Sequence, residues 1–382
     1  MDAKSIVRAL GSLRLTLVLL ILAAVLVFVG TMAQVKLGIH AAQVRYFQSL
    51  FVYAELGGGL RVPVLPGGYL IGGLMVINLI CAYATRIHRP RGRWGLLLVH
   101  AGLLMLLLGQ FVTDLLQVES TMRLKEGQRL NYSQSSRKFE LALIDLSDPD
   151  KDRVVAIPES VLQRQQVIRV PETPFTLRVL AYWPNSRPVQ GGSDGRAPEV
   201  TQGQGRQFRF QPAPRTTRTD RRDIPTAYVE VLVEGEPIGT WCASGWYEAP
   251  DRLSHGGREY ALWMRPARYY KPYYLKLIDF SHDRYLGTNI PKNFSSLVRI
   301  QNPQTGEDRE VLIYMNHPLR YGGETYYQSG YDENDPTVTI LQVVRNPGWL
   351  TPYVACLIVG IGMCMQFAGH LRRLFSRKQE VA

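Results

Sequence analysis

The amino-acid sequence predicts a membrane α-helical protein with four transmembrane helices and a large extracytoplasmic domain that is mainly β and sandwich-like. Three observations support this fold class. Four stretches of about 20 residues carry no charged side chain. Basic residues cluster beside these stretches. Apolar and polar residues alternate in several short runs between the third and fourth stretches.

The four uncharged stretches are residues 15–33, 67–85, 94–113 and 349–368. A bilayer core requires roughly 20 apolar residues per helix, so each stretch is long enough to span it. We therefore expect a membrane region with three helices over residues 1–117, and a fourth helix with a basic tail over 347–382. The first stretch is longer than the apolar core of a signal peptide, so we expect it to be retained.

The net charge of +12 is a signal of membrane topology. Three basic clusters flank the uncharged stretches: Lys4, Arg8 and Arg14; Arg86, Arg89, Arg91 and Arg93; and Arg372, Arg373, Arg377 and Lys378. Lys and Arg in short loops beside membrane spans mark the cytoplasmic side. We expect both termini in the cytoplasm of a bacterial inner membrane, and residues 118–346 on the periplasmic side. A nucleic-acid partner is not expected.

Residues 118–346 have the pattern of a β-rich domain. Phe175, Leu177 and Val179 alternate with polar neighbours, as a half-buried strand requires. Further strands are expected near 139–146, 228–234, 274–280, 297–300, 310–315, 325–328 and 337–344. Between them, residues 184–225 are rich in Pro, Gly, Gln and Arg, which predicts a long mobile loop that divides the domain into two lobes.

Cysteine usage excludes a disulfide inside the extracytoplasmic domain. Cys81, Cys356 and Cys364 lie in the expected spans, and Cys242 is the remaining cysteine. The sequence has no C-x-x-C motif, which argues against a thioredoxin-like reductant. We expect Cys242 to be a buried small side chain, the alternative being a free reactive thiol.

His100 is the candidate functional residue of the membrane region. It lies about 9 Å along the third span from its cytoplasmic end, at 1.5 Å per residue. A histidine in a bilayer needs a partner or a ligand, and neutral imidazole is a common ligand of haem iron. The alternative is a hydrogen bond to Asn78 of the second span or to backbone. Gly95, Gly102 and Gly109 predict close approach of another helix on the opposite face.

The remaining chemistry-bearing residues form no recognisable site. His88 and His370 lie among arginines beside spans, and the other histidines are His40, His255, His282 and His317. Their spacing matches no metal motif. The sequence also lacks the nucleophile elbow and the glycine-rich phosphate loops, so we predict no catalytic residue.

Four segments of the chain resemble the ResB-like family of System II cytochrome c biogenesis proteins. They are Ser12–Thr16 with Gly30-Thr31; His100-Ala-Gly102 with Gly109; Gly287–Ser296, Val311–Pro318 and Tyr321–Tyr331; and Asn346-Pro-Gly-Trp349. The third segment, which includes Tyr326-Tyr-Gln-Ser-Gly-Tyr331, is the most specific.

The resemblance implies a subunit of a haem export and attachment complex that is not an enzyme alone. A CcsA-like tryptophan-rich membrane subunit would be its partner, and apocytochrome c would receive haem b. The resemblance places an axial ligand of the haem iron at His100. The six tryptophans are scattered, so the partner must supply the tryptophan-rich loop. The distal lobe, 285–331, would face apocytochrome c. Two alternatives are a structural scaffold that does not contact haem and a transporter for another small molecule.

Overall fold

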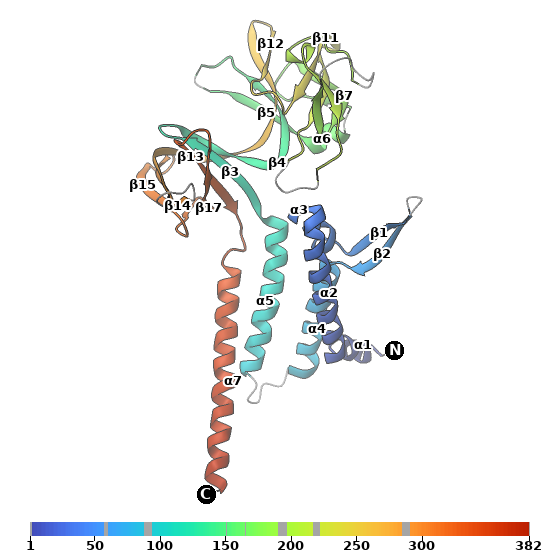
Figure 1. Ribbon diagram of the computed structural model, residues 1–382, viewed down its shortest axis with the longest axis vertical. Helices are drawn as coiled ribbons and strands as arrows, with labels where there is room; N and C mark the ends of the chain where they lie inside the picture. Colours follow the sequence, from blue (N-terminus) through green and yellow to red (C-terminus); the bar gives the residue numbers. More distant parts are fainter. Residues whose placement is uncertain are drawn as a thin grey trace. The chain divides into compact units, whose positions relative to one another are not determined.

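The computed structural model describes residues 2–56, 60–87, 94–149, 151–164, 166–189, 197–216, 222–284 and 291–381. The described chain forms two compact units. The helical unit contains the residues up to Val118 and those from Arg345 onward. The β unit contains the described residues from Glu119 to Val344. Each unit is described by itself (Figure 1).

The helical unit contains four helices that are long and apolar enough to cross a membrane within the described residues. Its elements are α1 (Ala3–Leu10), α2 (Leu13–Leu37), α3 (Ile39–Ala42), the π-helical turn η1 (Gln43–Phe47), β1 (Phe51–Leu56), β2 (Leu60–Pro66), α4 (Gly68–Ala82), the π-helical turn η2 (Tyr83–Ile87), α5 (Trp94–Leu116) and α7 (Thr351–Val381). Helices α2, α5 and α7 extend past the uncharged stretches, because backbone hydrogen bonding continues into polar sequence.

Helices α2 and α4 are joined by the polar groups of Asn78, which is buried. Its side-chain carbonyl accepts a hydrogen bond from Thr16 Oγ1 at 2.7 Å. Its amide donates to the backbone carbonyls of Leu10 at 2.5 Å and Ser12 at 3.2 Å. The Ser12 hydroxyl in turn caps α2 by accepting a hydrogen bond from Leu15 N.

Helices α5 and α7 lie side by side (Figure 1). A Cβ atom on Gly95 would lie 2.6 Å from the carbonyl oxygen of Gly362, and one on Gly102 would lie 2.5 Å from Val359 Cγ2. A Cβ on Gly109 would collide with Thr351. The predicted glycine seam is therefore confirmed, and its partner is α7.

The described residues of 34–66 connect α2 to α4 through α3, η1, β1 and β2. β1 and β2 form an antiparallel hairpin, and Val52 packs with Leu26 of α2 and Ile71 of α4. Tyr46 and Phe47 of η1 also pack against this cluster.

The β unit contains a ten-stranded sheet and a four-stranded sheet. Its elements are β3 (Val118–Lys125), β4 (Arg129–Asp145), β5 (Arg153–Pro158), α6 (Glu159–Arg164), β6 (Val167–Arg169), β7 (Phe175–Trp183), β8 (Ser186–Val189), the 3₁₀ turn η3 (Gln204–Arg206), β9 (Arg209–Pro212), β10 (Thr226–Val233), β11 (Glu236–Ser244), β12 (Asp251–His255), β13 (Arg258–Arg284), β14 (Pro291–Asn302), β15 (Glu307–Tyr314), β16 (Leu319–Tyr321), β17 (Glu324–Tyr331) and β18 (Val338–Arg345). The large sheet has the order β15-β14-β13-β4-β3-β18-β17-β16, and β5 and β12 pair with β4 and β13.

The β unit has two main hydrophobic cores. In the first, the four-stranded sheet β11-β10-β7-β6 shares buried side chains with β4, β5, β12 and β13, so two sheets pack face to face. The second core, called here the distal core, is formed by β3, β13, β14, β15, β16, β17 and β18. Met122, Leu275, Ile300, Tyr326 and Leu341 are among its fully buried side chains.

The predicted loop over residues 184–225 is wrong in two respects for its described part. It contains β8 and β9, which pair with each other, and the 3₁₀ turn η3. It also connects β7 and β10, which are neighbours in one sheet, so it does not separate two lobes. The physical reason is Phe210, which packs with Tyr228 and Cys242 and anchors a segment that is otherwise poor in apolar residues.

The glycine seam leads to a prediction about stability. Replacing Gly102 with Leu should force α5 and α7 apart and destabilise the protein by about 1–3 kcal/mol, as overpacking does. The measurement is thermal unfolding of the full chain in detergent. Gly360→Leu is the matched control, because a Cβ on Gly360 of α7 meets no described atom within 4 Å. Equal unfolding temperatures for the two variants would contradict a close contact between α5 and α7 at Gly102.

Candidate functional site

His100 lies on α5, on the face opposite the seam with α7. It is half-buried, and its Nδ1 atom is 2.8 Å from the backbone carbonyl oxygen of Leu96, one turn earlier. At 100° per residue, Leu107 and Phe111 lie within about 20° of His100 around the helix. These two residues line a cavity of about 630 Å³ between α5 and α4. The α5 face that carries His100 therefore continues into this cavity.

The contact with Leu96 determines which nitrogen of His100 is available. A carbonyl oxygen only accepts hydrogen bonds, so the Nδ1 atom of the neutral ring must carry the proton. The Nε2 atom then carries the lone pair. An Nδ1–H bond to a backbone carbonyl is the usual arrangement of a histidine that binds a metal through Nε2. The side chain thus has the form that axial ligation requires.

The alternative of a hydrogen bond between His100 and Asn78 is not present. Asn78 instead bonds to Thr16, Leu10 and Ser12, all near the start of α2. The other part of that alternative, a hydrogen bond to backbone, is present within α5 itself. It engages one ring nitrogen and leaves the second for another partner.

The remaining histidines are dispersed. His40 and His370 are exposed, and the His255 ring contacts Phe175. The His317 ring stacks on Tyr314 with centroids 4.1 Å apart. His88 lies outside the described residues. No group of three or more His, Cys, Asp or Glu that could hold a metal ion occurs in the described part of the chain.

His282 belongs to an aromatic cluster in the β unit. Its ring is nearly parallel to Phe294 at 5.1 Å and lies 4.2 Å from Tyr331. Strands β13, β14 and β17 supply one ring each. The cluster gives the distal core an aromatic edge.

A buried ion pair lies within the distal core. Lys271 Nζ donates to Glu324 Oε1 at 2.7 Å, and their side chains are 3% and 15% exposed. The hydroxyls of Tyr273 and Tyr326 donate to Glu324 Oε2 at 3.0 and 2.8 Å. Burial raises the pKa values of both tyrosines, so both remain protonated donors. The sequence analysis missed this network, although a lysine inside the aromatic run 269–274 is a signal for it.

Gln328 connects three strands around the same core. Its Oε1 atom accepts from Ser296 of β14 at 2.7 Å, and its Nε2 atom donates to Thr339 of β18 at 3.0 Å and to the carbonyl of Gly330 at 3.1 Å. Gln328 and Gly330 flank a register shift between β17 and β18. The most specific sequence segment, around Tyr326–Tyr331, thus has an internal structural role.

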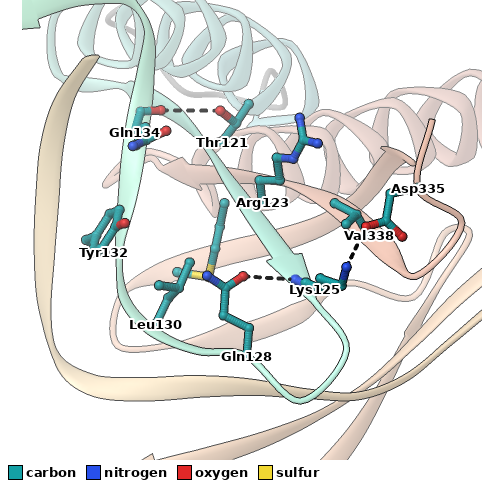
Figure 2. Close-up of a pocket in the computed structure, with 10 residues that line it drawn as sticks. Thr121, Arg123, Lys125, Gln128, Leu130, Tyr132, Gln134, Asp335 and Val338 are labelled. Atoms are coloured by element: carbon teal, nitrogen blue, oxygen red, sulfur yellow. Dashed lines mark hydrogen bonds and ion pairs between the residues drawn. The ribbon is translucent and has the colours of Figure 1, made fainter. Parts of the chain in front are cut away.

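A second cavity, of about 340 Å³, opens between β3 and β4 in the β unit. Figure 2 shows Thr121, Arg123 and Lys125 on one side and Gln128, Leu130 and Tyr132 on the other. The two strands pair at Thr121 and Gln134. Lys125 Nζ donates to Asp335 at 2.8 Å, and Arg123 pairs with Asp332. Because both cations are paired, this cavity has little net charge.

Cys242 lies in the interior of the β unit. It is fully buried, and it packs with Phe210 and Tyr228. Burial raises its pKa to about 12, so the thiolate that reacts is not formed near neutral pH. The expectation of a buried small side chain is confirmed.

These features define the class of protein: a chain with four apolar helices of membrane-spanning length and a large, mainly-β unit. Residues 251–340 match the model of the ResB-like family, which confirms the predicted family resemblance over this stretch. The chain is 33% identical over 92 residues to Protein NrfI of Wolinella succinogenes. That stretch covers 24% of this chain and 10% of NrfI, so the chain spans a small part of that relative.

The family match falls on the distal core and part of the first core. It includes Lys271, Glu324 and Gln328, which form the polar interior described above. It does not include His100. The family match and the candidate ligand therefore lie in separate parts of the chain.

The buried ion pair supports a prediction. Glu324→Gln removes the carboxylate that compensates the charge of Lys271, and it should lower the unfolding free energy by about 3–5 kcal/mol. Denaturant unfolding of the full chain measures this. Asp308→Asn, which breaks an exposed pair with Arg299, is the control and should have a much smaller effect, because solvent screens an exposed pair. A similar loss of unfolding free energy in both variants would show that burial does not make the Lys271–Glu324 pair more important for stability than an exposed pair.

Asp335 at the second cavity should make stability pH-dependent. Hydrogen bonds from Lys125, and then from Thr337, lower its pKa from 3.8 to about 2. Because the folded-state pKa is the lower one, the stabilisation is present above about pH 4 and is lost as the pH falls to about 2. Asp335→Asn should therefore destabilise the protein at neutral pH, and the difference should vanish near pH 2. Unfolding curves across this range test the prediction, and a difference independent of pH would refute it.

Proposed function

We propose that this chain acts in cytochrome c biogenesis, as the ResB-like subunit of a haem export and attachment complex. The match of residues 251–340 to the ResB-like family is the observation that carries the proposal. The similarity of 92 residues of this chain to Protein NrfI also supports the proposal.

The proposed location is a bacterial inner membrane that α2, α4, α5 and α7 cross. The basic clusters at both termini and around residues 86–93 favour a cytoplasmic location for these segments. The β unit then lies on the periplasmic or extracytoplasmic side.

His100 is proposed as one axial ligand of the haem that is being exported. The neutral imidazole with a fixed Nδ1–H bond has its Nε2 lone pair available. Haem is the cargo in this proposal, and the CcsA-like subunit supplies the opposing ligand. Imidazole ligation would hold the iron and set its redox potential during passage, and apocytochrome c would then receive the haem. This chain binds and orients; it carries no catalytic residue of its own in this proposal.

The distal lobe is proposed as the surface that faces apocytochrome c. Within the described part of 285–331, β15 lies at one end of the large sheet, and Leu312 on it is 51% exposed. Met315, which follows β15, is 48% exposed. An exposed apolar side chain on a terminal strand suits the recognition of an extended chain such as an unfolded apocytochrome.

A second candidate function is a structural scaffold that assembles the partner without contacting haem. The internal role of Glu324, Gln328 and their partners favours it, because the most specific family residues stabilise the β unit. Under this alternative, maturation depends on an intact β unit and not on His100.

One experiment distinguishes these two functions. The full chain is co-expressed with a CcsA-like partner, and the haem absorption spectrum of the purified complex is recorded with and without His100→Ala. We expect the variant to assemble but to lose or alter its haem spectrum, and added imidazole should restore it. Cytochrome maturation in cells should fall at least about tenfold, because the haem iron loses one of its proposed ligands.

Leu115→Ala on the same helix is the matched control. Leu115 is an exposed α5 side chain, and at 1.5 Å per residue it lies about 22 Å along the helix from His100. It should keep the haem spectrum of the wild type. An unchanged spectrum and normal maturation in His100→Ala would exclude the ligand role and favour the scaffold.

A further inference from the structure

The cavity between α4 and α5 does not contain His100 among the described residues that line it. Its volume of about 630 Å³ lies within the range of small-molecule sites, roughly 300–1,000 Å³. Gly68, Tyr69, Gly72, Gly73 and Val76 line it from α4; Leu107, Leu108, Gln110, Phe111 and Asp114 from α5; and Gln34, Gln43, Phe47 and Gln48 from α2 and the segment of η1.

The cavity has a polar end and an apolar end. At the polar end, Asp114 accepts hydrogen bonds from Gln48 Nε2 at 2.6 Å and from the Tyr69 hydroxyl. The antiparallel helices place Val76 and Leu107 about 10 Å further along, at 1.5 Å per residue. The cavity therefore matches an elongated amphiphile with a small polar head.

The apolar end has free space along α4. A Cβ atom on Gly72 or Gly73 would meet no described heavy atom within 4 Å. In a helix otherwise rich in Leu and Ile, these glycines leave a groove on the side of the cavity. An apolar chain fits such a groove between two apolar helices.

The charge of the cavity selects the head group. Among the described residues that line it, Asp114 has the one formal charge, and none is Lys or Arg. A phosphate or the carboxylates of haem would meet a like charge there without a cation to compensate. A neutral head with hydroxyl or carbonyl groups suits the site. The Asp114 carboxylate already accepts two hydrogen bonds, and it has lone pairs left to accept another from a hydroxyl group.

Three amides supply the complementary donors. Within the described residues, no hydrogen bond engages the side-chain amides of Gln34, Gln43 or Gln110. Next to them, Tyr69 and Phe111 pack edge to face with centroids 6.1 Å apart. Free N–H donors beside aromatic rings favour a planar ring with carbonyl oxygens over a glycerol head.

We propose that the α4–α5 cavity binds a membrane quinone or quinol. The ring lies at the polar end, where a quinol hydroxyl donates to Asp114 and a quinone carbonyl accepts from a glutamine amide. The isoprenoid chain lies along Gly72, Gly73 and Leu107. This site is independent of haem binding at His100.

The test is titration of the purified full chain in detergent with decylubiquinone, monitored by calorimetry. Gly72→Leu should fill the groove and raise the dissociation constant at least about tenfold, the equivalent of about 1.4 kcal/mol. Gly360→Leu is the matched control, since Gly360 is also a helix glycine with open space, and it should bind like the wild type.

Two further measurements identify the ligand class. Asp114→Asn should weaken the binding of reduced decylubiquinone more than the binding of the oxidised form. The reason is that only the reduced form has hydroxyl groups that donate a hydrogen bond to the carboxylate. Hemin and dioctanoylglycerol should not displace the bound quinone.

Equal binding by the Gly72→Leu variant and the wild type would overturn the proposal. So would displacement by dioctanoylglycerol, which would indicate a general lipid groove, or by hemin, which would indicate part of a haem path.

Discussion

The close contact of α5 with α7 is the constraint on which the helical half of this protein depends. Gly95 and Gly102 allow the two backbones to approach, and larger side chains at these positions would collide with Gly362 or Val359. This contact fixes the rotation of α5 about its axis. One face is then occupied by α7, and the opposite face, which carries His100 and Phe111, is turned toward other partners. A single row of glycines thus decides the direction in which His100 and Phe111 point.

Two buried ion pairs constrain the described part of the β unit. Arg265 is 1% exposed, and its Nε atom donates to Glu140 Oε1 at 3.0 Å, where β13 pairs with β4. Lys271 and Glu324 form the corresponding pair in the distal core. Such pairs add little net stability compared with apolar residues, but breaking one partner is costly, so they restrict how the strands can pair. Family-specific residues therefore occur at positions whose contacts are internal to the β unit.

The sequence predicted the helices well, because an uncharged apolar run of about 20 residues is rare outside membrane-spanning helices. It also predicted the helix contact at the glycine seam and the burial of Cys242. It failed over the described part of 184–225, where Phe210 packs with Tyr228 and Cys242 although the segment is mostly polar. It could not find the cavity between α4 and α5, because Tyr69, Gln48 and Asp114 come from three separate segments. The pattern of residues within one segment does not show which distant segments come together in the fold.

Strand β13 runs for 27 residues, from Arg258 to Arg284, and pairs with β4 over much of that length. Leu262 and Met264 belong to the first core, and Leu275 and Leu277 belong to the distal core. The two cores therefore share one continuous strand, whose pairing with β4 shifts register between Pro266 and Arg268 and between Tyr270 and Leu275. Local opening of one core must strain the hydrogen bonds of the other, so the β unit should exchange its amide hydrogens as one cooperative block.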